Sequence, residues 1–366
     1  SHRDQPFFVY LALNTPHSPM QVPDQYWKKF ADKKIIPDPE PANARKEKPI
    51  HTRAALAMCE NIDANVGRLI QHLDSSGLGE DTIVIYFSDN GPNGARFNAG
   101  MRGRKGSTNE GGLRSPCIIR YPRRIKPGTK VNRIAGAIDL LPTLADFAGI
   151  KFDAPKPLDG TSITRLLMGD GDDWKSRVIF SAWNKKATVR DDRYRLQLTG
   201  GLYDIINDPR EKNDLTSTRP EVVKRLKNEL DGWLAETALK SSRDPATRPI
   251  TLAHPEAEYT QLPSRDANAN GGVRRSNRFP NCTFMTNWKT PEDSITWDVE
   301  VLGSGEYEVQ MYYACKQADV GSKIELLVGD EKIEKTIEVA NEVPLIGAAE
   351  DRFQRVVGYV RDWRPM

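Results

Sequence analysis

Three apolar runs of strand length limit what the first third of this chain can fold into. They are Phe7–Leu13, Thr82–Phe87 and Pro116–Tyr121. Continuous apolar runs are typical of strands that are buried on both faces of a sheet. Between the first two runs, apolar residues recur at helical spacing from Ile62 to Leu73 and predict an amphipathic helix. This order predicts an α/β domain at 1–165, with a mainly parallel sheet that helices flank.

The next segment, 166–240, is predicted to form a small α+β subdomain. Apolar and polar residues alternate over the short segments 193–198 and 202–205, and this alternation favours antiparallel strands. Apolar residues at helical spacing follow from Val222 to Leu234, and Pro220 marks the start of that helix.

The last part of the chain changes in composition. Ser, Arg, Pro, Asn and Gly are frequent around 241–270, which we expect to be a linker. Beyond it, apolar residues alternate with polar ones at 295–301, 307–313 and 324–328, with a Gly-rich turn at 302–305. Such strands predict an antiparallel β-sandwich domain at 271–366.

The composition excludes some functions. The 366 residues carry 53 basic and 50 acidic side chains, a net charge of +3, which gives no electrostatic case for nucleic-acid binding. No apolar run is long enough to span a membrane. Cys282 and Cys315 lie in the same late segment and either pair or remain free; the spacing does not decide between these alternatives.

Polar residues with metal-binding chemistry follow the second apolar run. Ser88-Asp89-Asn90-Gly91 comes directly after Phe87, where ligands of open α/β sheets gather. Asn-Gly is also a hairpin signal, but the residues that follow do not alternate as a returning strand would. Asp89 and Asn90 supply two oxygen ligands for a hard cation such as Ca²⁺. Lys105 follows in a glycine-rich stretch, where it either faces solvent or meets an anion that approaches the backbone.

His17 stands at the corresponding position after the first run. It lies in Thr15-Pro16-His17-Ser18-Pro19, where two prolines restrict the turn around the imidazole. If Phe7–Leu13 and Thr82–Phe87 belong to one sheet, His17 is expected at the same edge as Asp89, Asn90 and Lys105. A metal and oxyanion site at this edge is then plausible on chemical grounds.

These motifs, in this order, resemble the sulfatase family of the alkaline-phosphatase-like superfamily. The resemblance is carried by "TPHSP", "SDNGP", "RGRKGSTNEGGLRSP" and "AIDLLPTLADFAGI", and it extends to "LYDIINDPREKNDLT". It spans about residues 7–235. It implies an alkaline-phosphatase-like fold and a sulfuric ester hydrolase, arylsulfatase-like, that acts on a sulfated carbohydrate or an aryl sulfate.

The resemblance also implies roles for individual residues. Asp89 and Asn90 are implied as Ca²⁺ ligands, whereas Lys105, His17 and Arg102 are implied to contact the sulfate ester. His17 is further implied to protonate the leaving alcohol, since imidazole titrates near neutral pH. The alcohol portion is expected to contact variable loops at 37–49 and 183–189. The family further implies a periplasmic or extracellular location.

One part of the family pattern is missing. The nucleophile of sulfatases is a formylglycine made from Cys or Ser in Cys/Ser-x-Pro-x-Arg, and no such pentapeptide occurs in this sequence. The early Asp-Asp pair that completes the Ca²⁺ ligands is absent too. We therefore expect the chain to be the C-terminal portion of a sulfatase, inactive by itself.

Two other readings of the sequence stay open. A related member of the superfamily hydrolyses phosphate esters, with two metals and several Asp and His ligands. Alternatively the chain is a carbohydrate-binding or structural remnant, in which aromatic residues of the last domain stack on sugar rings. The candidates for such stacking are Trp288, Trp297, Tyr312 and Tyr313.

Overall fold

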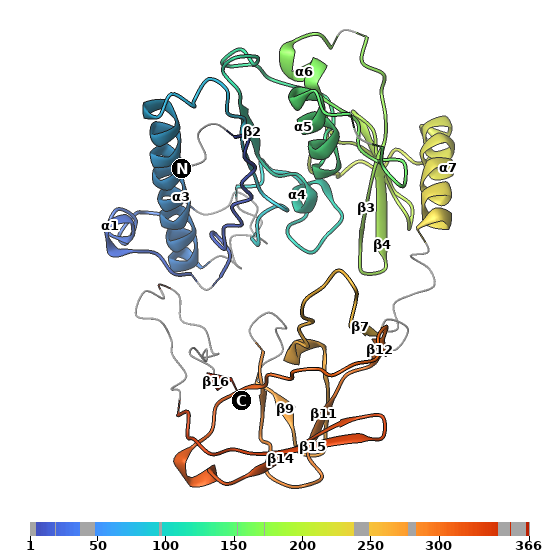
Figure 1. The fold of residues 1–366 in the computed structure, drawn as a ribbon. Helices are drawn as coiled ribbons and strands as arrows, with labels where there is room; N and C mark the ends of the chain where they lie inside the picture. The colour runs from blue at the N-terminus through green and yellow to red at the C-terminus, as the bar shows by residue number, and fades with distance from the viewer. Residues whose placement is uncertain are drawn as a thin grey trace. The chain divides into compact units, whose positions relative to one another are not determined.

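The computed structural model (Figure 1) divides the chain into two compact units, which are described separately. The structure describes residues 5–18, 20–36, 48–94, 97–151, 153–171, 173–237, 249–276, 283–342, 352 and 364–365. One unit comprises 34–49 and 62–241, and it holds Asp89, Asn90 and Lys105. The other comprises 1–33, 50–61 and 242–366, and it holds His17.

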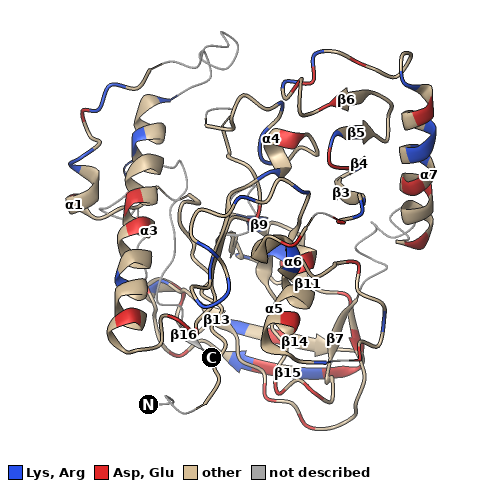
Figure 2. Cartoon of the chain, turned by 90° about the horizontal axis from the view of Figure 1, so that it is seen from above, with Lys and Arg blue, Asp and Glu red and all other residues tan. Residues whose placement is uncertain are grey.

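A four-stranded antiparallel sheet covered by one helix is the best-packed part of unit 62–241. Its strands, in spatial order, are β3 (Ile179–Trp183), β4 (Lys186–Arg190), β5 (Tyr194–Gln197) and β6 (Leu202–Asp204). Helix α7 (Pro220–Glu236) lies against this sheet in Figure 1. Leu226, Leu230 and Leu234 recur at helical spacing and pack on Val189 and Leu202. Charged residues of both signs recur along α7 between its other positions (Figure 2), and the expected helix and strands are confirmed.

A second cluster of the same unit contains the strand pair that precedes the candidate site. Strand β1 (Val84–Phe87) pairs with β2 (Cys117–Arg120) in antiparallel register, Phe87 opposite Cys117. Three short helical elements follow β2 along the chain. They are the 3-10 turn η1 (Ala137–Asp139), helix α5 (Leu140–Ala148) and helix α6 (Thr164–Met168). Side chains from these helices form most of the core, which contains Ile125, Phe147, Ile163, Leu166 and Leu167.

The other unit combines an N-terminal helical cluster with paired strands. Helix α1 (Asp24–Trp27) and the first turns of α3 (Pro49–Ser75) enclose a small core of Met20, Val22, Ala54, Ala57 and Met58. Its described strands pair in twos. The pairs are β7 (Ile250–Leu252) with β12 (Val299–Val301), β8 (Asn268–Asn270) with β11 (Ser294–Thr296), β9 (Arg274–Arg275) with β10 (Met285–Thr286), β13 (Tyr312–Tyr313) with β16 (Arg364–Pro365), and β14 (Lys323–Val328) with β15 (Glu331–Thr336).

Three expectations about strands need correction. Residues 7–13 form no strand, and Phe8, Tyr10 and Leu11 are exposed. A buried strand needs a hydrogen-bonded neighbour, and none of the described residues pairs with this run. The pair β1–β2 is antiparallel, so the expected parallel pairing is not formed by these residues. At 307–313 only β13 is a strand, because Tyr307 and Val309 face solvent.

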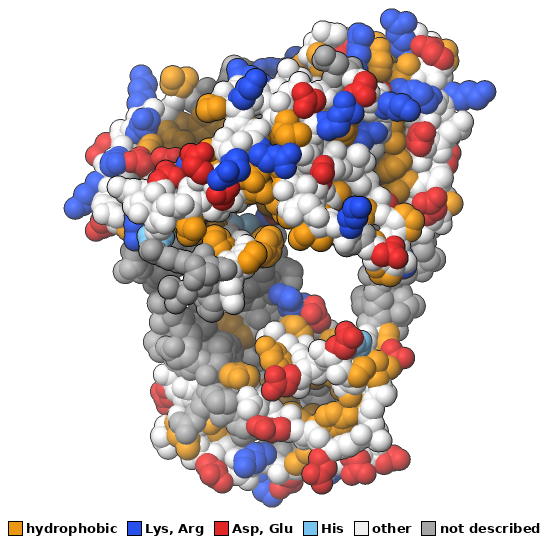
Figure 3. Space-filling model, turned by 45° about the horizontal axis from the view of Figure 1, so that its top comes forward, with side chains coloured by type: hydrophobic (Ala, Val, Ile, Leu, Met, Phe, Trp, Pro, Cys, Tyr) orange, Lys and Arg blue, Asp and Glu red, His pale blue; other side chains and the backbone are white. Residues whose placement is uncertain are grey.

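The described residues mix helices with strands, and their strand pairs are antiparallel except for β7–β12. The described strands of 249–342 pair in twos, so a two-sheet sandwich is not observed among them. No helix of the described part is both long and apolar enough to cross a membrane. On the face shown in Figure 3, basic and acidic side chains are interspersed. Cys315 is a buried free thiol, and Cys282 lies outside the described residues.

Candidate functional site

The polar turn after β1 places two oxygen-bearing side chains next to each other. Asp89 is exposed and Asn90 is half-buried. The Asn90 side-chain amide donates from Nδ2 to the carbonyl oxygen of Gly91 at 2.8 Å. This bond fixes the orientation of the amide and leaves its oxygen, Oδ1, as the free acceptor.

Two backbone hydrogen bonds fasten this turn to the glycine-rich loop at 97–113. The Gly91 N–H donates to the Gly112 carbonyl at 2.9 Å, and the Lys105 N–H donates to the Pro92 carbonyl at 2.9 Å. The Ser115 hydroxyl adds a bond to the Ser88 carbonyl at 2.6 Å. The structure therefore brings Asp89, Asn90 and Lys105 into one region, as the sequence predicts.

Close backbone packing explains why this loop is rich in glycine. A Cβ atom on Gly91 would lie 2.1 Å from the Gly111 carbonyl oxygen, and one on Gly112 would lie 2.5 Å from the Arg104 carbonyl oxygen. Gly103 and Gly106 adopt φ values of +91° and +80°, which other residues rarely tolerate. The glycines are thus needed to bring the turn and the loop together.

Gly91→Ala is expected to lower the free energy of unfolding by about 1–3 kcal/mol, since the methyl group overlaps the Gly111 carbonyl. Urea unfolding followed by circular dichroism measures this. Gly232→Ala in α7 is the matched control: nothing lies within 4 Å of its added Cβ, and helix propensity predicts a gain of about 0.5–1 kcal/mol. Equal unfolding midpoints for Gly91→Ala and wild type would contradict the packing argument.

Buried ion pairs hold the opposite side of the loop on the four-stranded sheet. Arg195 and Glu211 are both fully buried and form a bidentate pair, with Arg195 Nε 3.0 Å from Glu211 Oε1. Arg195 Nη1 also donates to the Thr108 carbonyl at 3.3 Å. Glu110, in the short helix α4 (Glu110–Leu113), pairs with Arg190. The charges of β4, β5 and residue 211 therefore anchor the loop that carries Lys105.

Two loop side chains take part in this anchoring. Arg114 Nη1 lies 3.9 Å from Glu110 Oε1, one turn away along the chain. Arg102 Nη1 donates to the Glu211 carbonyl at 3.4 Å, and its guanidinium lies 5.7 Å from the centre of the Tyr203 ring. These contacts favour a structural role for Arg102 over the substrate contact that the resemblance implies.

Lys105 differs from its anchored neighbours. Its side chain is exposed, and no described residue forms an ion pair or hydrogen bond with its ammonium group. The loop backbone is fixed while this cation is free to meet an anion. Such a combination suits a preorganised oxyanion contact.

His17 lies in the other unit, at the end of a turn in which its N–H donates to the Asn14 carbonyl at 3.0 Å. The imidazole is exposed, and its Nδ1 is 2.7 Å from the Ser18 carbonyl oxygen. Because a carbonyl only accepts, Nδ1 carries the proton in this contact. Nε2 is then left for other partners.

The donor set fits part of a Ca²⁺ site. Among the described residues no group of three or more His, Cys, Asp or Glu is placed to hold a metal. Asp89 and the free Asn90 oxygen nevertheless supply two hard ligands of the six to eight that Ca²⁺ takes. These two residues fit the cation that the family implies, and further ligands are required.

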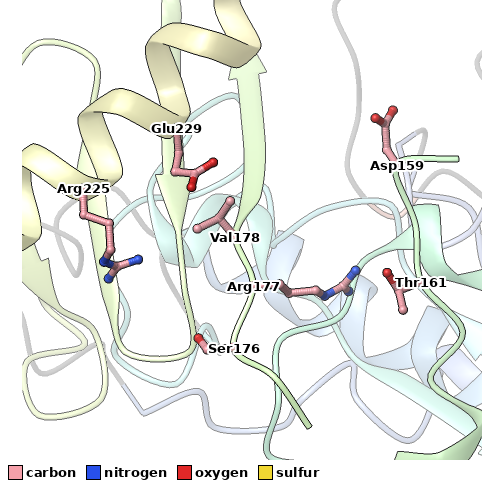
Figure 4. Close-up of a pocket in the computed structure, with 7 residues that line it drawn as sticks. All are labelled: Asp159, Thr161, Ser176, Arg177, Val178, Arg225 and Glu229. Atoms are coloured by element: carbon pink, nitrogen blue, oxygen red, sulfur yellow. The ribbon is translucent and has the colours of Figure 1, made fainter. Parts of the chain in front are cut away.

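A separate cavity of about 720 Å³ lies elsewhere in the same unit. Figure 4 shows its lining: Asp159, Thr161, Ser176, Arg177, Val178, Arg225 and Glu229. Arg177 is paired with the buried Asp139, and Arg225 with Asp191. Because its cations are neutralised in this way, the cavity offers no free charge for an anion.

The aromatic candidates of the last domain have mixed surroundings. Tyr313 is buried and donates to the Val339 carbonyl, so it is a core residue. Trp297 is half-buried and donates to the Pro263 carbonyl at 3.0 Å. Trp288 and Tyr312 are 43% and 60% exposed. Only these last two remain available for stacking.

One set of residues near the site was not singled out from the sequence, and one predicted segment needs to be narrowed. Arg195 and Glu211 look like ordinary surface charges in the sequence, and only tertiary packing shows that both are buried; Arg190, which pairs with Glu110, is half-buried. Trp183 lies in a segment expected to contact substrate, 183–189, but residues 187–189 are buried in β4. Only the hairpin tip of that segment faces solvent.

Comparison with known proteins relates this chain to one family. The sulfatase family model matches residues 1–150, and the model for the C-terminal part of N-sulphoglucosamine sulphohydrolase matches residues 105–236. A sulfatase of Formosa agariphila is 30% identical over 271 residues, which are 64% of this chain and 47% of that protein. Human arylsulfatase A is 34% identical over 186 residues, 49% of this chain and 32% of that protein.

Solved structures agree with the sequence relatives. The crystal structure of Ps i-CgsB in complex with k-i-k-neocarrahexaose has a TM-score of 0.54 and 26% identity, covering 63% of this chain and 51% of that one. The chain thus spans about half or less of the length of these relatives. The solved neighbours support the alkaline-phosphatase-like fold that is expected from the sequence. Residues 1–150 match the sulfatase family and residues 105–236 match the C-terminal part of a sulphohydrolase, so residues 1–236 of this chain are similar to sulfatases.

Proposed function

We propose that this chain contributes the Lys105 loop and the Asp89-Asn90 turn to a sulfuric ester hydrolase. The observation that carries the proposal is the pair of backbone bonds, Gly91 to Gly112 and Lys105 to Pro92. They hold two oxygen ligands and one unpaired cation together in a chain that is similar to sulfatases.

The proposed roles of Lys105, Asp89 and Asn90 follow from the surroundings of their side chains. The Lys105 ammonium binds a sulfuryl oxygen and opposes the negative charge that develops there during transfer. Asp89 and the Asn90 oxygen would hold Ca²⁺, and the cation would supply positive charge that stabilises negative charge on the sulfuryl group. For His17, which lies in the other unit, we propose only the role that the family resemblance implies, proton exchange with the oxygen of the leaving alcohol. The nucleophile, a formylglycine, is not among the 366 residues.

The relatives favour a carbohydrate substrate. Two proteins of Bacteroides thetaiotaomicron, named N-acetylglucosamine-6-O-sulfatase and N-acetylgalactosamine-6-O-sulfatase, are 31% and 28% identical over 206 and 271 residues. One structural neighbour was solved with a neocarrahexaose. We therefore propose a sulfated glycan as the substrate class and a periplasmic or extracellular location.

The 366-residue chain alone is expected to show no turnover of 4-nitrocatechol sulfate, because its sequence contains no Cys/Ser-x-Pro-x-Arg motif for the nucleophile. A colorimetric assay of the purified chain with added Ca²⁺ measures this, with a known arylsulfatase as the positive control. Turnover that co-purifies with the chain and is lost in Lys105→Ala would contradict the expectation.

The test of the proposed function begins with the coding DNA before the Ser1 codon. Where that DNA encodes the nucleophile motif in frame, the encoded protein is expected to hydrolyse aryl sulfates or sulfated sugars in a Ca²⁺-dependent manner. A protein that contains the motif, carries the formylglycine and cleaves phosphate esters but not sulfate esters would overturn the proposal.

A further inference from the structure

Trp183 ends β3 but stays out of the core that the neighbouring aromatic residues share. Phe180 and Tyr194 pack against the core cluster, and Trp233 stacks on Phe180 with ring centroids 5.1 Å apart. Trp183 is 60% exposed, and no described residue accepts a hydrogen bond from its indole N–H. The exposed indole therefore contributes little to the core and leaves an aromatic face and an N–H donor open to a ligand.

The indole lies next to the loop that carries Lys105. Its nitrogen is 3.8 Å from the position that a Cβ atom on Gly106 would occupy. Gly106 directly follows Lys105 and has no side chain, so nothing of that residue separates the indole from the loop backbone. A ligand anchored on Lys105 therefore has an aromatic surface beside it.

Two unpaired cations share the hairpin tip with this indole. Lys186 is the cross-strand partner of Trp183 in the β3–β4 register, so both side chains project from the same face of the sheet. Lys185 lies in the turn between them, after Asn184, which has a φ of +56°. All of these residues are exposed, and no described residue pairs with either ammonium group. The tip thus combines an aromatic face with positive charge.

We propose that the hairpin tip Trp183–Lys186 is a binding subsite for the alcohol portion of the substrate, and that this alcohol is a saccharide ring carrying a second anionic group. The inference rests on the proposed function, because a sulfate ester on Lys105 is what places its alcohol beside Gly106. The sugar ring stacks on the indole, and the indole N–H donates to a hydroxyl oxygen. Lys185 and Lys186 meet the second sulfate or carboxylate.

The experiment is an NMR titration of the 366-residue chain with two main ligands, and the monosulfated form of the first serves as a comparison. One is a chondroitin-type disaccharide with two sulfate groups, and the other is ethyl sulfate, which has no ring. Trp183→Ala is expected to weaken disaccharide binding about tenfold and Trp183→Phe about two- to threefold, while ethyl sulfate binding stays unchanged. The double variant Lys185→Ala/Lys186→Ala should weaken binding of the disulfated disaccharide more than that of its monosulfated form. Tyr259→Ala, an exposed aromatic residue of the other unit, is the control.

The outcomes separate the two proposals. If Lys105→Ala weakens binding of both ligands but Trp183→Ala leaves the disaccharide affinity unchanged, the subsite is overturned and the proposed function stands. If Lys105→Ala leaves binding of both ligands unchanged, or if neither binds the wild-type chain, the proposed function fails and the subsite fails with it. Weaker disaccharide binding in Trp183→Ala, with unchanged ethyl sulfate binding, supports both.

Discussion

Arg195→Met is expected to lower the free energy of unfolding of unit 62–241 by about 3–5 kcal/mol, because it leaves the buried Glu211 carboxylate without its main partner. Both side chains are fully buried, so water cannot replace the guanidinium. The substitution also removes one of two donors to the carbonyl of Thr108, three residues from Lys105; the other is the Thr188 hydroxyl. Denaturant unfolding followed by circular dichroism measures the loss.

Two controls separate the buried pair from general charge effects. Arg165→Met removes an ion pair with Asp173 that is mostly exposed, so its unfolding midpoint should stay close to that of wild type. Arg195→Met/Glu211→Met replaces both charges by apolar side chains and should recover part of the stability lost in the single variant. A single variant as stable as Arg165→Met would show that the burial seen here is not maintained in solution.

The sequence predicted those elements whose signal is local. Periodic apolar residues identified α7, and continuous apolar runs identified β1 and β2. Phe7–Leu13 was expected as a buried strand from composition alone. Burial depends on what covers a segment, and no described strand pairs with this one.

The residues of the candidate site also fall into those that the sequence could predict and those that it could not. Asp89, Asn90 and Lys105 could be predicted because they lie near one another in sequence and the glycines between them indicate close backbone approach. The anchors Arg195 and Glu211 could not, since a buried charge and a surface charge look alike in a sequence. The sequence placed Trp183 within the segment 183–189, and the β3–β4 register shows that it lies at the hairpin tip opposite Lys186.

Lys105→Ala is expected to reduce kcat/KM for an aryl sulfate by about 10²–10³-fold, measured in a protein that joins this chain to the formylglycine segment. The effect should fall on chemistry and not on folding, because the side chain is exposed and no described residue contacts its ammonium group.

Arg104→Ala is the matched control for that prediction. Arg104 is an exposed cation of the same loop, directly before Lys105, and no described residue pairs with its guanidinium. Its loss removes the same charge from the neighbourhood and should change kcat/KM by less than about threefold. Since the Lys105 N–H is held on Pro92 whereas the Arg104 N–H faces the Ser107 hydroxyl, the loop gives these two side chains different positions. Equal losses in the two variants would mean that the loop acts through its overall positive field, and Lys105 would then lose its assignment as the specific contact to the sulfuryl oxygen.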